Sequence, residues 1–153
     1  MSDPAYESDN VFAKILRGDL PCCKVYEDDK TLAMMDIMPR ADGHVLVLPK
    51  AASRNILDIA PEDLTAVALT AQKIARAVKK AFAADGTSIY QFSEKAGGQE
   101  VYHTHVHVIP RFNDVPLGEH TGKMADQEKL AALAAKITSA IDYVTSFLPG
   151  GNR

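Results

Sequence analysis

The spacing of apolar positions divides the chain into helical and extended segments. Apolar residues that recur every three or four positions mark the buried face of a helix. Gly18 follows the first such segment, as is common at a helix end, and Pro61 opens the second, as is common at a helix start. The predicted helices cover residues 11–16, 61 to about 84, and about 126–144.

Short apolar runs bounded by Gly, Pro and Asp lie between these helices and predict strands. The predicted strands are residues 24–27, 31–36, 44–48, 88–92 and 101–109. Strands and helices do not alternate strictly, as they would around a parallel sheet. The order therefore predicts an α+β fold, with an antiparallel sheet of about five strands, two main helices and a short N-terminal helix.

Length and charge narrow the class of protein. A chain of 153 residues suffices for one hydrophobic core, so we expect a single domain over residues 10–148, a flexible leader at 1–9 and a frayed end at 149–153. The 17 Lys and Arg against 20 Asp and Glu argue against a nucleic-acid polymer as partner. Because no secretory signal or long apolar run is evident, we expect a cytoplasmic protein with no membrane partner.

Cys22 and Cys23 are neighbours in the sequence. Adjacent cysteines have poor geometry for a structural disulfide, and two thiols are too few for a Cys-rich zinc site. We therefore expect both to be reduced, structural thiols.

The segment VYHTHVHVIP, residues 101–110, holds three of the five histidines. Side chains alternate between the faces of a strand, so His103, His105 and His107 would share one face. An exposed polar face that uses His by chance explains this concentration poorly. A shared zinc ion is a stronger alternative, but the strand advances ~13 Å over these residues, so only two neighbours could bind one ion. Nucleophilic and acid–base catalysis on a phosphate is the third interpretation.

The same segment, from His103 to Ile109, resembles the H-φ-H-φ-H-φ-φ signature of the histidine triad family of nucleotide hydrolases and transferases, where φ is apolar. Thr104 departs from the pattern. The resemblance is to the bacterial and fragile-histidine-triad type and covers about residues 11–111. It includes DIMP at 36–39, GHVLVLPK at 43–50 and GGQEV at 97–101.

The resemblance implies a role for four histidines. His105 would attack the α-phosphate and form a nucleotidyl-histidine intermediate, which water then hydrolyses. His103 would orient the ring of His105 through its backbone or side chain, and His107 would bind the phosphate oxygens. His44 would lie against the phosphate as a further stabilising group.

The resemblance also implies nucleotide contacts. Asp36 would hold the ribose hydroxyls, with Ile37 beside it. The backbone amide of Gly98 and the side chain of Gln99 would lie near the phosphate. Ser93 stands where many members place an asparagine or glutamine, so it would substitute for that contact.

These observations together predict a hydrolase that releases a nucleoside monophosphate, AMP above all, from a phosphoramidate, dinucleoside polyphosphate or related conjugate. The alternatives are a nucleotide-binding regulatory protein with little turnover and a metal-dependent hydrolase. We expect no required cofactor, with magnesium accompanying only polyphosphate substrates, and no metal ligands. Asn10 and Ala13 stand where some bacterial members carry a Cys-x-x-Cys zinc half-site. Family members are usually homodimers, so we expect a homodimer whose ligand is a purine nucleotide.

Overall fold

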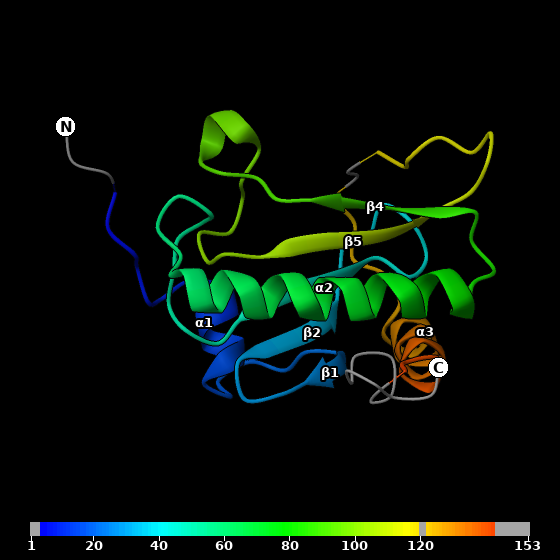
Figure 1. The fold of residues 1–153 in the computed structure, drawn as a ribbon, viewed down its shortest axis with the longest axis horizontal. Coiled ribbons are helices and arrows are strands. Elements are labelled where there is room, and N and C mark those ends of the chain that lie inside the picture. The colour runs from blue at the N-terminus through cyan, green and yellow to red at the C-terminus, as the bar shows by residue number, and fades with distance from the viewer. Residues whose placement is uncertain (1–3, 120–121, 143–153) are drawn as a thin grey trace, which may run out of the picture.

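The computed structural model describes residues 4–119 and 122–142. They form an α+β domain around one five-stranded antiparallel sheet of order β1-β2-β3-β5-β4, which confirms the predicted fold class (Figure 1). The elements are α1 (Val11–Leu16), β1 (Lys24–Glu27), β2 (Thr31–Met35), β3 (Val45–Pro49), α2 (Pro61–Ala81), β4 (Gly86–Tyr90), a 3-10 turn η1 (Lys95–Gly97), β5 (Val106–Arg111) and α3 (Gln127–Ser139).

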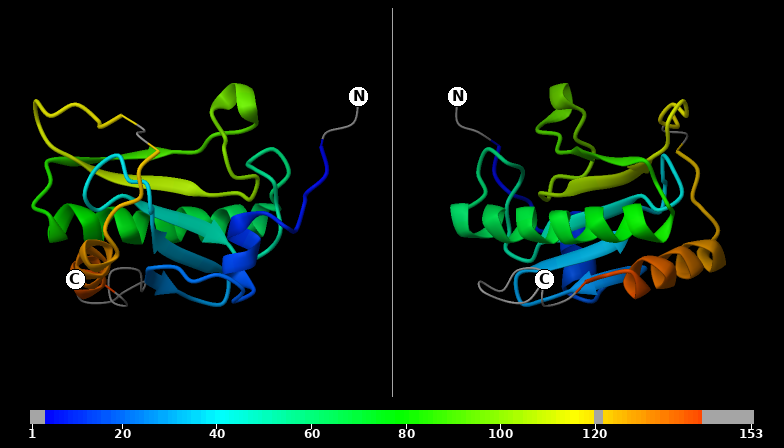
Figure 2. Two further views of the ribbon diagram at one scale, coloured as in Figure 1. Left: turned by 180° about the vertical axis from the view of Figure 1, so that it is seen from behind. Right: turned by 45° about the vertical axis from the view of Figure 1, so that its right-hand side comes forward.

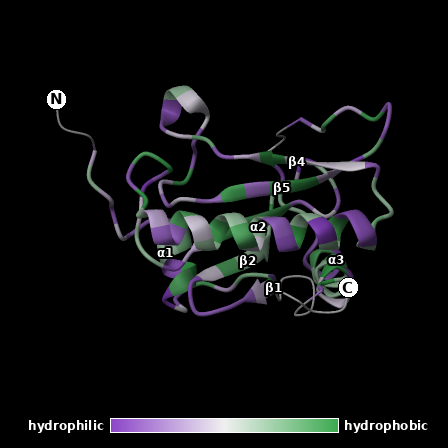
Figure 3. Ribbon diagram, viewed as in Figure 1, coloured by the Kyte–Doolittle hydropathy of each residue, from purple (hydrophilic) through white to green (hydrophobic). Residues whose placement is uncertain are grey.

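Helices cover the two faces of the sheet unequally. Helices α2 and α3 pack on one face against alternate strand residues such as Ala33, Val47 and Val108, and this cluster is the main core. Along α2 in Figure 3, hydrophobic and hydrophilic residues alternate, as expected for a helix with one buried face. Helix α1 lies on the opposite face, seen from behind in Figure 2, where Phe12 packs near Leu46. This second face has room for a cavity.

The helix ends follow the sequence signals. The side chain of Asn10 caps α1 by accepting a hydrogen bond of 2.8 Å from the backbone N–H of Ala13. Gly18 follows α1 with a φ of 84°, the left-handed conformation that favours glycine. Pro61 is the first residue of α2, as predicted, and α3 ends at Ser139, earlier than expected. The remainder of the last predicted helix includes Val144, which lies outside the described residues, as does the predicted frayed end at 149–153.

The predicted strand at 101–109 is wrong in its first half, because β5 begins only at Val106. The pairing of β3 with β5 starts with Val47 opposite Val106. Continuing this register would bring Thr104 opposite Pro49, which has no N–H to donate. The N–H of Thr104 instead donates to the carbonyl of Ser53 at 2.8 Å. His103 and His105 therefore lie in an irregular segment that enters β5, and not on one flat strand face.

The N-terminal segment, predicted as a flexible leader at 1–9, contacts the domain where the structure describes it. The hydroxyl of Tyr6 lies 2.7 Å from Nδ1 of His103. The guanidinium of Arg17 donates to the carbonyl of Ser8 at 2.6 Å. The leader therefore makes specific contacts with the domain from at least Tyr6 onward. Among the described residues, no helix has the length and apolarity that a membrane span requires.

Candidate active site

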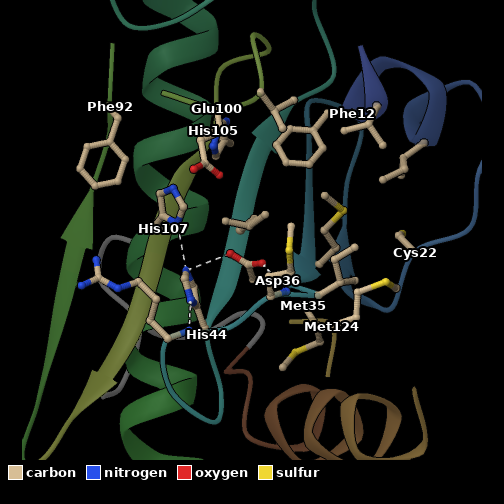
Figure 4. Close-up of a pocket in the computed structure, with 18 of the residues that line it drawn as sticks. Phe12, Cys22, Met35, Asp36, His44, Phe92, Glu100, His105, His107 and Met124 are labelled. Atoms are coloured by element: carbon tan, nitrogen blue, oxygen red, sulfur yellow. Dashed lines mark hydrogen bonds and ion pairs between the residues drawn. The ribbon is translucent and has the colours of Figure 1, made fainter. Parts of the chain in front are cut away.

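A cavity of about 580 Å³ opens on the α1 face of the sheet. This size is typical of small-molecule sites. Its lining combines the imidazoles of His44, His105 and His107 with apolar side chains such as Met35 and Phe92 (Figure 4). A polar reactive end and an apolar end therefore share one cavity.

The structure brings together most of the residues that the sequence singled out. The six that line the cavity are Asp36, Ile37, His44, Gly98, His105 and His107. His103 lies behind the wall, fully buried, and Gln99 is also buried outside the cavity. The hydroxyl of Ser93 pairs with the side-chain amide of Gln91 and does not line the cavity.

His105 is held in a single tautomer. Its Nδ1 donates to the carbonyl oxygen of His103 at 2.7 Å, since a carbonyl can only accept. The ring of Phe12 meets it edge-on, with the centroids 4.9 Å apart. Burial lowers the pKa of His105, an effect that the His103 carbonyl and the charge of Asp36 partly oppose. The imidazole is therefore neutral at neutral pH, with its lone pair on Nε2.

His103 is fully buried and bonded through both ring nitrogens. Its Nε2–H donates to the carbonyl of Pro49 at 2.8 Å, and its Nδ1 accepts from the hydroxyl of Tyr6 at 2.7 Å. Burial also lowers the pKa of His103, so the ring is neutral. The structure thus gives His103 contact with His105 through its backbone carbonyl, one of the two routes that the sequence left open.

His44 and His107 form a second chain of hydrogen bonds. The backbone N–H of Arg40 donates to Nδ1 of His44 at 3.1 Å, which places the proton of a neutral His44 on Nε2. That nitrogen lies 2.9 Å from Nδ1 of His107 and donates to it. A neutral His107 must then carry its own proton on Nε2. His105, just before β5, and His107, within it, are therefore complementary, because His105 offers a lone pair at Nε2 and His107 an N–H.

A close backbone approach fixes the chain just before β3, where His44 is found. Gly43 has a φ of 93°, and a Cβ at this position would lie 2.5 Å from the ring of Phe82. Glycine is therefore required by both conformation and space. This packing sets the position from which the ring of His44 reaches His107.

Asp36 lies at the end of β2, beside the imidazole chain. Its Oδ1 accepts from the backbone N–H of Met38 at 2.9 Å, and its Oδ2 lies 3.4 Å from Nε2 of His44. Figure 4 shows His44 between His107 and Asp36, with contacts to both. The carboxylate therefore faces the cavity from a fixed orientation.

Asp36, His44 and His107 also bring three potential metal-ligand atoms within 4.8 Å of one another. A metal would need the lone pair of His44 Nε2. The N–H of Arg40 claims the lone pair on Nδ1, so the ring proton occupies Nε2. The tautomer of His44 therefore favours a hydrogen-bond relay over a metal centre.

Gln99 and Gly98 have partners other than those the sequence predicted. The Gln99 amide donates to the carbonyls of Arg54 and Val101, at 2.7 and 3.0 Å. Its Oε1 accepts from the backbone N–H of Glu94 at 2.8 Å. The N–H of Gly98 donates to the carbonyl of Lys95 at 3.0 Å. Gln99 thus holds the loop together, and Gly98 contributes surface to the cavity while its amide bonds within η1.

The sequence reasoning did not single out four residues that line the cavity or contact its histidines. Phe92 packs on His107 with the ring centroids 5.3 Å apart, and Glu100 lines the cavity. Arg40 lines the cavity and orients His44 through its N–H. Phe92 could have been found from the alternating strand pattern that includes Tyr90. Glu100 could have been found from its nearness in sequence to the histidines. Nothing in the sequence connects Tyr6 with His103, 97 positions away.

Cys22 and Cys23 carry free thiols, as the sequence predicted. Burial raises the pKa of both thiols. Cys22 lines the cavity close to α1, but a protonated thiol is a poor nucleophile. Its contribution is to the apolar wall.

An antiparallel α+β domain with imidazoles gathered in a cavity at the end of one strand is the arrangement expected of a histidine triad protein. Residues 17–114, more than half of the chain, match the HIT domain, and the chain therefore belongs to this family. A HIT-like protein of Borreliella burgdorferi is 39% identical over 87% of this chain and 99% of its own length. Adenylylsulfatase HINT3 of Arabidopsis thaliana is 37% identical over 69% of this chain, which spans about half (53%) of that protein.

Solved structures agree with this assignment. A HIT-like protein from Bartonella henselae, described as involved in cell-cycle regulation and crystallised with an unknown ligand, superposes with a TM-score of 0.85, at 49% identity over 90% of this chain and all of its own. A zinc-bound histidine triad protein from Mycobacterium smegmatis gives a TM-score of 0.77, at 34% identity over 86% of this chain and 92% of its own. Their shared fold extends over nearly the whole domain.

Proposed function

We propose that this protein hydrolyses adenylyl conjugates, releasing AMP by covalent catalysis on His105. The observation that carries the proposal is the tautomer of His105, whose Nδ1 donates to the His103 carbonyl at 2.7 Å and so leaves a lone pair on Nε2 in the cavity wall. A neutral imidazole fixed in this way is a nucleophile. The family relationship and the adenylylsulfatase relative support the same chemistry.

In the first step, Nε2 of His105 attacks the α-phosphorus and the bond to the leaving group breaks. The leaving group departs with the electron pair and takes up a proton from solvent, to which the attacking water of the second step returns one. The phosphorylated imidazole keeps its proton on Nδ1 and becomes cationic. The carbonyl of His103, already bonded to that N–H, stabilises the new positive charge.

In the second step, water attacks the phosphorus, the N–P bond breaks and AMP leaves. The Nε2–H of His107, set by the chain from Arg40 through His44, would donate to a phosphoryl oxygen in both steps. Because this donor is oriented before the substrate arrives, it needs no reorganisation during the reaction. The enzyme returns to its starting state with one water consumed.

The rest of the cavity suits a nucleoside. The carboxylate of Asp36 has two oxygens and can accept from both ribose hydroxyls while keeping its bond to Met38. Ile37 is 40% exposed in the cavity wall and, with Phe12 and Met35, gives the apolar surface that a purine ring requires. A purine nucleotide is therefore the ligand we propose, AMP being the released product.

The charge of the cavity favours a leaving group of low negative charge. Among the described residues, Arg40 is the only cationic side chain in the lining, and its Nε donates to the carbonyl of Gly118 at 2.8 Å. Asp36 and Glu100 contribute carboxylates. A polyphosphate chain would meet more repulsion than attraction here. We therefore propose phosphoramidates or similar adenylyl conjugates as substrates in preference to dinucleoside polyphosphates.

The test is release of AMP from adenosine 5′-phosphoramidate and from diadenosine tetraphosphate, each with EDTA and with magnesium. Wild type should release AMP from the phosphoramidate in EDTA, and His105→Ala should not. Folding of the variant is checked by circular dichroism. Tight AMP binding without turnover of either substrate would instead indicate the nucleotide-binding regulatory protein.

The same assay separates the metal-dependent alternative. Dialysis against a chelator, followed by metal analysis, should leave the rate on the phosphoramidate unchanged. Stoichiometric zinc whose removal abolishes activity would contradict the imidazole mechanism and favour a metal at Asp36, His44 and His107.

We also propose a homodimer and a cytoplasmic location. Helix α2 carries Leu69 with 57% of its surface exposed, and the edge strand β4 carries Ile89 at 51%. Both sites could bury apolar surface in a dimer. Sedimentation equilibrium of the wild type, with Leu69→Lys and Ile89→Lys as separate variants, identifies the face that is used.

A further inference from the structure

Tyr6 connects the N-terminal segment to the histidines of the site. Its hydroxyl lies 2.7 Å from Nδ1 of His103, and its ring meets the imidazole at a centroid distance of 5.7 Å and an angle of 67°. Tyr6 precedes the stretch that matches the HIT domain, residues 17–114. The contact is therefore additional to the features that define the family match.

We propose that Tyr6 is a positioning residue for the nucleophile, acting through His103. The proposal rests on the function proposed above, since it gives Tyr6 a role in orienting His105 for attack. Tyr6 does not line the cavity and so would not touch the substrate.

The chain of contacts has three steps. The Tyr6 hydroxyl donates to Nδ1 of His103, which fixes the remaining ring proton on Nε2. That Nε2–H donates to the carbonyl of Pro49 at 2.8 Å, so the ring is tied at both ends. The backbone carbonyl of His103 in turn accepts the hydrogen bond from Nδ1 of His105. The tautomer of His105 therefore depends on a residue held in place from the N-terminal segment.

Burial makes the hydroxyl important. His103 has no exposed surface, so water cannot readily replace the Tyr6 hydroxyl while the ring stays in place. Without this donor, Nδ1 of His103 becomes a buried acceptor that lacks its partner. The ring can recover a partner by changing its tautomer or by rotating, and either change loosens its bond to Pro49 and shifts the carbonyl that holds His105.

The variant Tyr6→Phe removes only the hydroxyl. Tyr26→Phe is the matched control, because the Tyr26 hydroxyl also makes a part-buried hydrogen bond, to Asp28 at 2.8 Å, and lies outside the cavity lining. Two readouts apply to both variants. The first is the set of imidazole nitrogen shifts and couplings in ¹⁵N-labelled protein, which report each histidine tautomer. The second is the kcat and KM for adenosine 5′-phosphoramidate.

In Tyr6→Phe we expect the signal of His105 to change from a single Nδ1–H tautomer to a mixture, and kcat to fall by about tenfold with KM unchanged. Tyr26→Phe should keep the wild-type tautomer and kcat. An unchanged His105 tautomer, or an unchanged kcat in active enzyme, would overturn the proposal. The nitrogen spectra need no turnover, so failure of the proposed function and failure of the positioning role give different results.

Discussion

Nδ1 of His105 donates to the carbonyl oxygen of His103, two residues earlier in the chain, at 2.7 Å. This one bond determines which nitrogen of the buried imidazole can react. It is available because His103 and His105 lie in the irregular segment before β5, and not in a paired strand. The end of the β3–β5 pairing at Val47 and Val106 is thus part of how the site is built.

The first prediction concerns the pH dependence of the reaction. Attack requires neutral His105, and burial lowers its pKa below the ordinary value of about 6.5. The rate should therefore stay on its plateau as pH falls through 6.5 and decline only at lower pH. The measurement is kcat/KM between pH 4.5 and 8 on an N-alkyl phosphoramidate of adenosine. An acidic limb centred above 6.5 would contradict the assignment.

The second prediction concerns stability. Burial lowers the pKa of both His103 and His105 in the folded state, while the unfolded chain titrates near the ordinary value of about 6.5. Below that pH the unfolded chain binds more protons than the folded chain. The free energy of unfolding should therefore be largest above about pH 6.5 and fall as the pH is lowered toward the folded-state pKa values. Urea unfolding between pH 5 and 7 measures this slope, which should be smaller in His105→Gln.

The third prediction addresses the relay through His44. His44→Ala removes the donor that sets the tautomer of His107, so the Nε2–H that faces the phosphate is no longer fixed. We expect kcat to fall by about 10–100-fold, as for other groups that orient a reacting residue. Cys22→Ala, another change in the cavity wall, is the control and should retain activity. Equal losses in both variants would mean that His44 only fills space.

The fourth prediction distinguishes the two roles considered for Gln99. Its buried side chain hydrogen-bonds to the carbonyls of Arg54 and Val101 and to the N–H of Glu94, beneath a loop whose residues 95–98 are exposed. Gln99→Leu leaves these groups without a partner and should lower the free energy of unfolding by about 1–3 kcal/mol. Ser93→Ala, in the same loop, is the control. If Gln99→Leu kept full stability and raised KM instead, Gln99 would be a phosphate ligand after all.

Sequence reasoning located the elements and half of the site. The apolar pattern sufficed to place the helices and four strands. The long helices each bury one regularly spaced face, and the strands are short apolar runs, two of which, β2 and β3, are buried along their whole length. The pattern failed for residues 101–105, because the pairing of β3 with β5 begins only at Val47 and Val106 and the N–H of Thr104 donates instead to Ser53. These partners are decided by the fold and not by the local pattern. The resemblance led to His44, Asp36 and His107, which the structure gathers in one cavity.

Tautomers and loop contacts were beyond such reasoning. The proton of His44 is placed by the backbone N–H of Arg40, and that of His103 by Tyr6, contacts that exist only after folding. The resemblance implied that Gln99 lies near the phosphate, yet its side chain is buried and its amide donates to the carbonyls of Arg54 and Val101. The residue types indicate which groups can donate, accept or react. Only the folded contacts determine which imidazole nitrogen carries the proton and which groups the Gln99 amide binds.

During turnover, Nε2 of His105 is expected to carry the nucleotide. The direct measurement is rapid quenching of enzyme with excess adenosine 5′-phosphoramidate into mild alkali, where phosphohistidine survives, followed by mass spectrometry of the intact protein and its peptides. We expect an AMP adduct on the peptide containing His105, absent from His105→Ala and formed at a rate no slower than AMP release. Turnover without any adduct, or an adduct on His103 or His107 with His105→Ala fully active, would contradict the account.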